Sequence, residues 1–294
     1  MTQINPPNSS SSYANAFAWP APAKLNLFLH VTGRRSNGYH TLQTLFQIVD
    51  FCDRLYFTPR GDGLIRRSGG AVDIPEDADL SVRAAQLLKQ ASGCDLGADI
   101  RIEKNIPLGA GLGGGSSNAA TTLVALNHLW NLGFAPDQLT RLGLQLGADV
   151  PVFVRGRTAW AEGVGEQLRA LPDFPQDWFL VVTPEVQVST GDIFNAPELR
   201  RDAPPVTLED FNAGRTQNDC EAVTCARYPQ VREALSALRR LGPAAMSGTG
   251  ASVFLNCTSR EAAEQARQAL PANWRTFIAQ GLNQSPLTGI IRAA

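Results

Sequence analysis

The strongest constraint on this chain is a glycine-rich stretch, Pro107-Leu-Gly-Ala-Gly-Leu-Gly-Gly-Gly-Ser-Ser-Asn118, with five glycines within residues 109–115. Because glycine has no Cβ, the backbone N–H groups of such a loop can converge on one point. An apolar run follows, which predicts a helix over residues 117–132 that ends at Gly133. The N-terminus of that helix would direct more unpaired N–H groups to the same point. The stretch therefore predicts an anion site, and the usual anion for such a loop is a nucleotide phosphate.

The spacing of these glycines differs from two common phosphate-binding patterns. A dinucleotide-binding loop reads G-x-G-x-x-G, whereas this one reads G-x-G-x-G-G-G. A Walker A loop ends in Gly-Lys-Ser/Thr, and here the glycines run into Ser116 and Ser117 without a lysine. A flexible linker is the alternative, because Gly and Ser dominate linkers too. We favour a phosphate loop, since a linker would not run directly into an apolar helix.

The composition excludes several classes of protein. The 294 residues are 44% hydrophobic and 18% charged, which is typical of a globular chain. The net charge is −1, so there is no broad basic field to attract nucleic acid or an anionic membrane. Five cysteines without a C-x-x-C pair predict buried thiols in a reducing compartment, and three scattered histidines form no metal-binding pattern.

The N-terminus lacks the features of a targeting signal. Residues 1–18 contain four consecutive serines but neither a basic start nor an apolar core, so we expect a disordered tail there. No apolar run approaches the ~18 residues that a membrane span needs. These observations predict a soluble cytoplasmic protein, and they do not indicate its oligomeric state.

The alternation of strand-like and helix-like segments predicts an α+β fold. The least patterned stretch, residues 155–177, is where we place the boundary between an N-terminal domain over 19–158 and a C-terminal domain over 159–294. The expected strands are 23–31, 42–50, 54–59, 98–104, 150–154, 178–183, 251–255 and 274–282, and the expected helices are 80–92, 117–132, 136–146, parts of 208–240, and 260–270.

Three separated segments resemble the GHMP kinase superfamily, the group of galactokinase, homoserine kinase and mevalonate kinase. They are the glycine loop, the N-terminal Pro22-Ala-Lys-Leu-Asn-Leu27 and the C-terminal Ser247-Gly-Thr-Gly-Ala-Ser-Val-Phe254. The resemblance implies a two-domain fold, with an N-terminal ATP-binding domain and the active site in the cleft between the domains. It also implies ATP and Mg²⁺ as cofactors. The residues that would contact ATP are Lys104, Pro107, Gly109, Gly111, Leu112, Gly113, Gly114, Gly115, Ser116 and Ser117.

Two more motifs, Asn37-Gly-Tyr-His40 and Leu146-Gly-Ala-Asp-Val-Pro-Val-Phe153, resemble one branch of that superfamily. That branch phosphorylates the 2-hydroxyl of a cytidine diphosphate derivative of methylerythritol, in the non-mevalonate route to isoprenoid precursors. Three alternatives stay open from the sequence. They are a GHMP kinase for another small hydroxyl substrate, a nucleotide-binding homologue without catalysis, and a nicotinamide-dependent oxidoreductase.

Lys24 and Asp149 are the candidate catalytic residues. The resemblance implies that Asp149 takes the proton of the attacking hydroxyl, and that Lys24 orients this carboxylate and stabilises the charge on the transferred phosphoryl group. The alternative for Asp149 is a turn or helix-cap residue. The alternative for Lys24 is an edge-strand lysine whose ammonium reaches water.

The substrate-binding candidates surround the expected cytosine ring. Asn26 lies two residues after Lys24, on the same strand face, where it could hydrogen-bond the substrate. By resemblance, Tyr39 stacks on the base, His40 bonds its edge, and Phe194 closes the far side with Thr190 nearby.

Ser116 and Ser117 are expected to cap the helix, contact the β-phosphate or help to hold Mg²⁺. The sequence does not identify the other metal ligands. Gly248 and Gly250 are expected either to let the backbone approach the active site closely or to form a plain hairpin turn.

Overall fold

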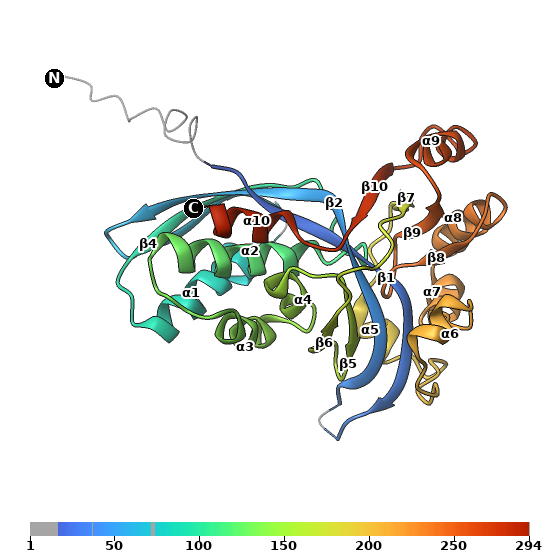
Figure 1. The fold of residues 1–294 in the computed structure, drawn as a ribbon, viewed down its shortest axis with the longest axis horizontal. Coiled ribbons are helices and arrows are strands. Elements are labelled where there is room, and N and C mark those ends of the chain that lie inside the picture. Colours follow the sequence, from blue (N-terminus) through green and yellow to red (C-terminus); the bar gives the residue numbers. More distant parts are fainter. Residues whose placement is uncertain (1–16, 37, 72–73, 294) are drawn as a thin grey trace.

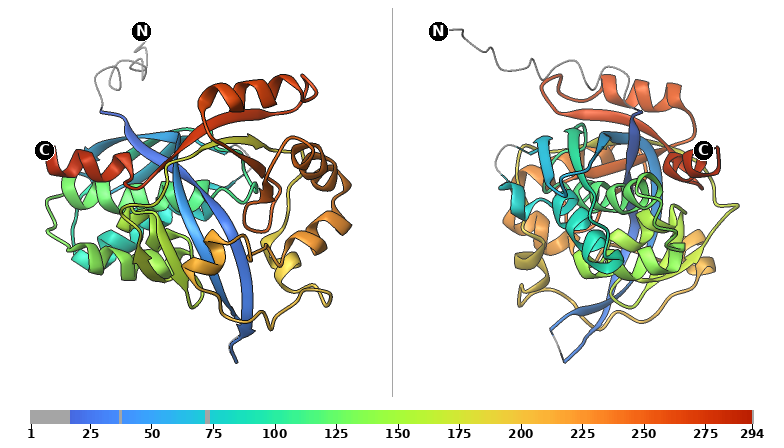
Figure 2. Two further views of the ribbon diagram at one scale, coloured as in Figure 1. Left: turned by 45° about the vertical axis from the view of Figure 1, so that its right-hand side comes forward. Right: turned by 90° about the vertical axis from the view of Figure 1, so that its left-hand side faces the viewer.

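The structure of this chain, a computed structural model, describes residues 17–36, 38–71 and 74–293. Most of the predicted tail over 1–18 therefore lies outside the described residues. Two long antiparallel strands run through the molecule, as both views of Figure 2 show. They are β1 (Trp19–Arg34) and β2 (His40–Arg60). The predicted strands 42–50 and 54–59 are one continuous strand, because Cys52 and Asp53 keep their pairing with Pro22 and Ala21.

A sheet is built around β2 in the order β3-β4-β2-β10-β7-β9-β8, and β1, β5 and β6 join it beside this path. Only β3 and β4 pair in parallel among the described strands. The remaining strands are β3 (Ile65–Gly69), β4 (Gly97–Glu103), β5 (Ala159–Glu162), β6 (Gln167–Ala170), β7 (Trp178–Val182), β8 (Ala244–Met246), β9 (Val253–Cys257) and β10 (Thr276–Leu282).

Helices α1 to α4 gather on one side of the long strands, and α8 and α9 lie at the other end of the molecule (Figure 1). The predicted α1 and α3 are confirmed residue for residue. The helices are η1 (Glu76–Ala78), α1 (Leu80–Ser92), α2 (Gly114–Leu129), α3 (Pro136–Leu146), α4 (Val150–Arg155), α5 (Thr190–Phe194), α6 (Leu208–Asn212), α7 (Glu221–Arg227), α8 (Pro229–Arg239), α9 (Arg260–Gln268) and α10 (Pro286–Ala293).

One predicted strand is wrong. Residues 150–154 form most of helix α4, not a strand. Pro151 lies in the first turn of this helix, where its missing N–H group costs no hydrogen bond, and Gly156 ends the helix at φ 60°. Because the run Val150–Val154 is buried throughout, it lacks the polar positions that would reveal a helical period.

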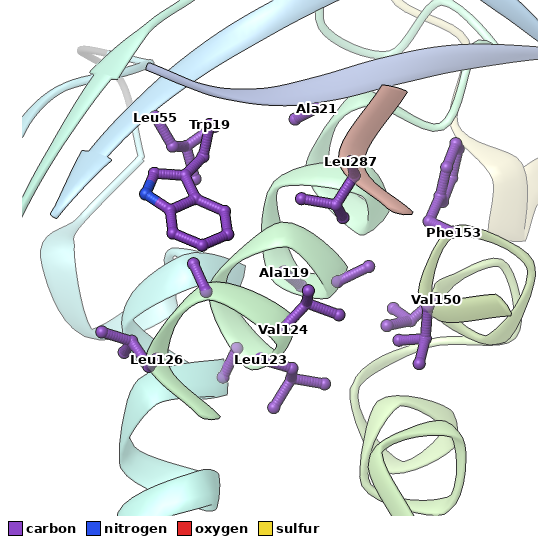
Figure 3. Packing of buried hydrophobic residues seen from close by; sticks show 14 of the residues in the cluster. Trp19, Ala21, Leu55, Ala119, Leu123, Val124, Leu126, Val150, Phe153 and Leu287 are labelled. Atoms are coloured by element: carbon purple, nitrogen blue, oxygen red, sulfur yellow. The ribbon is translucent and has the colours of Figure 1, made fainter. Parts of the chain in front are cut away.

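The buried side chains form four clusters, and β1 contributes to each of them. Trp19 and Ala21 belong to the cluster around α2, whereas Ala23 and Leu25 belong to a second cluster beneath the glycine loop. Phe28 packs in a third, and Leu29 and Val31 pack with α8 and β9 in the fourth. Figure 3 shows the first cluster, where α2 packs between Trp19, Val150, Phe153 and Leu287.

The described part of the chain contains no helix with the length and apolar character of a membrane span. All five cysteines are free thiols, but only Cys220 and Cys257 are buried as predicted, whereas the other three are half-buried. Burial and neighbouring carboxylates raise the pKa of Cys52 to about 12, so this thiol stays protonated.

Candidate active site

A cavity of about 770 Å³ opens where the glycine loop, β1, the start of α4 and α5 meet. The cavity collects nearly all of the site residues that the sequence predicts, the exception being Ser117, which is buried behind its wall. The predicted residues that line it are Lys24, Asn26, Tyr39, His40, Lys104, Pro107, Gly109, Gly111, Leu112, Gly113, Gly114, Gly115, Ser116, Asp149, Thr190 and Phe194.

The glycine loop is held between β1 and the 247–250 turn. Lys24 N donates to Leu112 O at 3.0 Å, and Ser247 Oγ donates to Gly111 O at 2.9 Å. A Cβ on Gly111 would lie 2.3 Å from Ser247 O, so only glycine fits this close approach at φ 72°. In the described part of the chain, the backbone N–H groups of Gly111, Leu112 and Gly113 donate no hydrogen bond. These donors are therefore free for an anion.

Helix α2 begins at Gly114, three residues before the predicted start, and its N-cap is Gly113 in the left-handed conformation. The prediction that Ser116 or Ser117 caps this helix is therefore wrong. Ser117 is fully buried, and its Oγ has no hydrogen-bond partner among the described residues. A buried hydroxyl without a partner is costly, so this oxygen marks a place where a ligand would supply the missing bond.

Lys24 and Asp149 form an ion pair, with 3.2 Å between Lys24 Nζ and Asp149 Oδ2. The Lys24 side chain is only 3% exposed, which rules out the alternative of an edge lysine that reaches water. Its ammonium also donates to Asn26 Oδ1 and lies 5.3 Å from the centroid of the Phe46 ring. Asp149 precedes α4, but its side chain makes no capping bond and is 34% exposed. The carboxylate is thus held by Lys24 and accessible from the cavity.

Asn26 is fixed on both sides. Its Nδ2 donates to Thr44 Oγ1 at 2.9 Å, and its backbone N donates to Ser247 Oγ at 3.1 Å. Because Ser247 in turn donates to the glycine loop, β1, β2 and the C-terminal turn form one hydrogen-bonded frame around Lys24. Gly248, at φ 58°, lies close to this frame: a Cβ there would be 3.6 Å from Lys24 Nζ.

The rim of the cavity carries aromatic side chains. Phe194 stacks on His40 with ring centroids 5.2 Å apart and planes 26° apart. Tyr39 is 62% exposed at the mouth, and Thr190 Oγ1 lies 3.2 Å from Thr249 Oγ1. Burial lowers the pKa of His40, and the cations of Arg201 and Arg34 lower it further. The rim therefore presents a neutral imidazole beside two aromatic rings.

Comparisons with known proteins match this architecture. Residues 79–157 match the family profile described as GHMP kinases N terminal domain, and residues 207–276 match that described as GHMP kinases C terminal. The 4-diphosphocytidyl-2-C-methyl-D-erythritol kinase of Nitrosococcus oceani is 54% identical over 269 residues, which are 92% of this chain and 96% of that protein. This chain belongs to the 4-diphosphocytidyl-2-C-methyl-D-erythritol kinase family of GHMP kinases.

Other relatives agree. The kinase of the same name from Alkalilimnicola ehrlichii is 56% identical over 93% of this chain and 94% of its own length. A crystal structure of 4-(cytidine 5'-diphospho)-2C-methyl-D-erythritol kinase superposes with a TM-score of 0.78 at 36% identity, over 90% of this chain and 99% of the other. Homoserine kinase from Cytophaga hutchinsonii, at 19% identity and a TM-score of 0.66, shares the fold, with 96% and 98% of the two chains covered. The predicted superfamily and α+β fold are confirmed, whereas the domain boundary at 158 stays a prediction.

The sequence analysis missed a buried carboxylate beneath the glycine loop of this GHMP kinase. Asp53, fully buried in β2, forms an ion pair with Lys104 and accepts from the backbone N–H groups of Asn105 and Ile106, each at 2.8 Å. Asn118 Nδ2 also donates to it at 2.8 Å. Lys104, predicted to lie near ATP, therefore lines the cavity and ties the loop to β2. A charge in the middle of an apolar strand was the available signal.

Arg201 was also missed. It donates from Nε to His40 Nε2 at 3.1 Å, across 161 positions of sequence. Nothing in the sequence around Leu199-Arg-Arg-Asp202 distinguishes Arg201 from the neighbouring Arg200, which is 51% exposed and pairs with Asp202.

Proposed function

We propose that this GHMP kinase transfers the γ-phosphoryl group of ATP to the 2-hydroxyl of 4-diphosphocytidyl-2-C-methyl-D-erythritol, giving ADP and the 2-phosphate. The observation that carries the proposal is the Lys24–Asp149 pair, which faces the same cavity as both the free N–H groups of the glycine loop and the aromatic rim. The names of the close relatives supply the substrate.

ATP and the cytidine substrate bind at opposite ends of the cavity. The phosphates of ATP lie over the N–H groups of residues 111–113 and the N-terminus of α2, whose dipole favours an anion. The cytosine ring lies at the rim, where His40 bonds its edge and Tyr39 and Phe194 contact its faces. The methylerythritol unit then spans the space before Asp149.

In the chemical step, Asp149 accepts the proton of the 2-hydroxyl while the hydroxyl oxygen bonds to the γ-phosphorus and the bond from that phosphorus to the bridging β,γ-oxygen breaks. ADP leaves with the electron pair of that bond. Lys24 holds the Asp149 carboxylate in place and offsets the negative charge that accumulates on the transferring group. Positioning and electrostatics supply most of the catalysis in such transfers.

Mg²⁺ fits this cavity as the partner of ATP. The described residues contain no group of three His, Cys, Asp or Glu side chains that could hold a metal. Mg²⁺ commonly needs only one or two protein oxygens, because substrate phosphates and water complete its shell. The Ser116 hydroxyl on the cavity wall is an oxygen donor of the required kind, and the partnerless Ser117 Oγ lies one residue further along α2, behind that wall. When bound, the ion would neutralise phosphate charge.

The test is an assay of ADP release by the purified chain with ATP and, in separate reactions, 4-diphosphocytidyl-2-C-methyl-D-erythritol, mevalonate, homoserine and galactose. We expect turnover with the cytidine compound alone, and a new phosphomonoester in the ³¹P NMR spectrum of its product. Turnover of one of the other alcohols without the cytidine compound would refute the proposed substrate. ATP binding without turnover of any of the four would refute the proposal of a kinase for this substrate.

Asp149→Asn tests the assigned base. We expect kcat to fall about 10²–10⁴-fold, with KM for ATP unchanged, because the amide cannot accept the proton. The matched control is Asp137→Asn, which removes a carboxylate that is 66% exposed and pairs with Arg155 on the surface. If Asp149→Asn turns over as fast as this control, Asp149 is not the base.

A further inference from the structure

Arg201 links the two aromatic side chains of the cavity rim. Its Nε donates to His40 Nε2 at 3.1 Å, and its Nη2 donates to Phe194 O at 2.9 Å and to Ala196 O at 2.6 Å. Its Nη1 donates to Leu199 O at 2.9 Å. The guanidinium thus joins the first residue of β2 to the last residue of α5 and to the segment that follows it, and all three of its nitrogens donate hydrogen bonds.

The bond to His40 determines which ring nitrogen carries the proton. An arginine Nε–H group can only donate, so His40 Nε2 must accept. A neutral imidazole that accepts at Nε2 carries its proton on Nδ1. Nδ1 has no hydrogen-bond partner among the described residues, and His40 lines the cavity. The nitrogen left for a ligand is therefore a donor.

We propose that Arg201 is a positioning residue for substrate recognition: it fixes His40 as the Nδ1–H tautomer and holds Phe194 against that ring, so the base-binding rim is formed before substrate arrives. A donor at this place selects a ring edge that offers an acceptor, and N3 and O2 of cytosine are such acceptors. This ligand assignment rests on the proposed function, whereas the tautomer assignment rests on the geometry of Arg201 alone.

The charge of His40 agrees with this arrangement. Burial lowers the pKa of His40, and the Arg201 and Arg34 guanidinium groups lower it further. Protonation at Nε2 would turn the acceptor into a donor that faces the Arg201 Nε–H group. The contact is therefore compatible only with neutral His40.

The direct test is the ¹⁵N NMR spectrum of the histidine rings in the full chain, with and without Arg201→Met. Only three histidines are present, so His40→Gln assigns the signals. We expect a protonated Nδ1 and an unprotonated Nε2 in the unmodified chain, and a mixture of tautomers in Arg201→Met. The matched control is Arg200→Met, because Arg200 is 51% exposed and pairs with Asp202 on the surface. This change should leave the spectrum of His40 as it is in the unmodified chain. An unchanged Nδ1–H tautomer in Arg201→Met would overturn the proposal.

Kinetics supply a second readout. We expect Arg201→Met to raise KM for the cytidine substrate about 10- to 100-fold, because the substrate loses a preorganised hydrogen bond. KM for ATP should stay the same. An equal rise in both KM values would indicate a general structural defect and overturn the positioning role. If Arg201→Met does not fold, Arg201→Lys carries the same test, because a compact ammonium cannot replace the planar fork. If the unmodified chain does not turn over the cytidine substrate, the proposed function fails, and the tautomer comparison still decides the role of Arg201.

Discussion

Replacing Lys24 by methionine separates what this residue does for catalysis from what it does for stability. Methionine has a similar length and no charge, so it fills the same space between β1 and α4. The change removes the ion pair with Asp149 at 3.2 Å, the bond to Asn26 and the contact with the Phe46 ring. It also removes the need to bury an ammonium group that is 3% exposed.

The two effects on stability oppose each other. At 3.2 Å, an ion pair in an effective dielectric of about 20 gains about 5 kcal/mol. The 34% exposure of the Asp149 side chain reduces that gain by solvent screening. Burying the ammonium costs several kcal/mol, so we expect the free energy of unfolding to change by no more than ~2 kcal/mol, in either direction. In the transition state, by contrast, one preorganised charged donor contributes about 3–4 kcal/mol, so catalytic turnover should slow by about 10²–10³-fold.

The assay is ADP release at saturating ATP and cytidine substrate, together with denaturant unfolding of the same preparations. Lys89→Met is the matched control, because Lys89 lies on α1 away from the cavity and donates to backbone oxygens of Gly63 and Asp95. We expect Lys89→Met to keep its turnover rate. A folded Lys24→Met that also turns over at the unmodified rate would refute the catalytic role of the ammonium. If unfolded protein accounted for the whole loss of turnover, the prediction that the gain and the cost in stability nearly cancel would be refuted.

Two further predictions concern the loop and the rim. Gly113→Ala places a Cβ 2.8 Å from the Phe153 ring at φ 73°, whereas the control Gly133→Ala has φ 72° and no atom within 4 Å of its Cβ. Both variants should lose ~1–2 kcal/mol of unfolding free energy because an L-residue adopts a positive φ. Gly113→Ala should lose about 1–3 kcal/mol more in denaturant unfolding, because its methyl group overlaps the ring. Equal losses of unfolding free energy in the two variants would show that the loop moves to make room for the added methyl group, and would contradict the prediction. Because the pKa of His40 is lowered from 6.5 in the folded chain, the unfolded chain binds a proton more readily, and stability should fall as pH decreases below 6.5 towards the lowered value. Unfolding measured from about pH 7.5 to about pH 5 should show a weaker pH dependence in His40→Gln, and identical profiles would contradict the pKa shift.

Local patterns predicted several of the residues that meet in the cavity. The glycine loop and the helix after it were readable because a positive φ and a close backbone approach require glycine, and few other signals imitate that density. The shared face of Lys24 and Asn26 followed from the two-residue period of a strand, and the two side chains are in fact bonded. A charge inside an apolar strand predicted only that Lys24 has a partner or a function, whereas the family resemblance named Asp149 as that partner.

Local sequence patterns could not predict the long-range contacts or the secondary structure of fully buried runs. Arg201 meets His40 across 161 positions, and its neighbour Arg200 has the same chemistry but points to solvent. The run Val150–Val154 is buried on every side, so it carried no period to separate a helix from a strand. The Asp53 carboxylate pairs with Lys104 and accepts from Asn118, and only the tertiary fold brings these two residues to it.

Strand β1 also bears on how this protein can change over generations. It sends side chains into all four hydrophobic clusters, so the first and second halves of the chain share it. In a hybrid chain that joined the first half of one relative to the second half of another, β1 would pack against side chains of the other relative in at least one cluster. Recombination should therefore be tolerated only where β1 and the residues that pack against it come from the same parent. Since Lys24 and Asn26 lie on the same strand, such a mismatch would reach the reacting atoms directly.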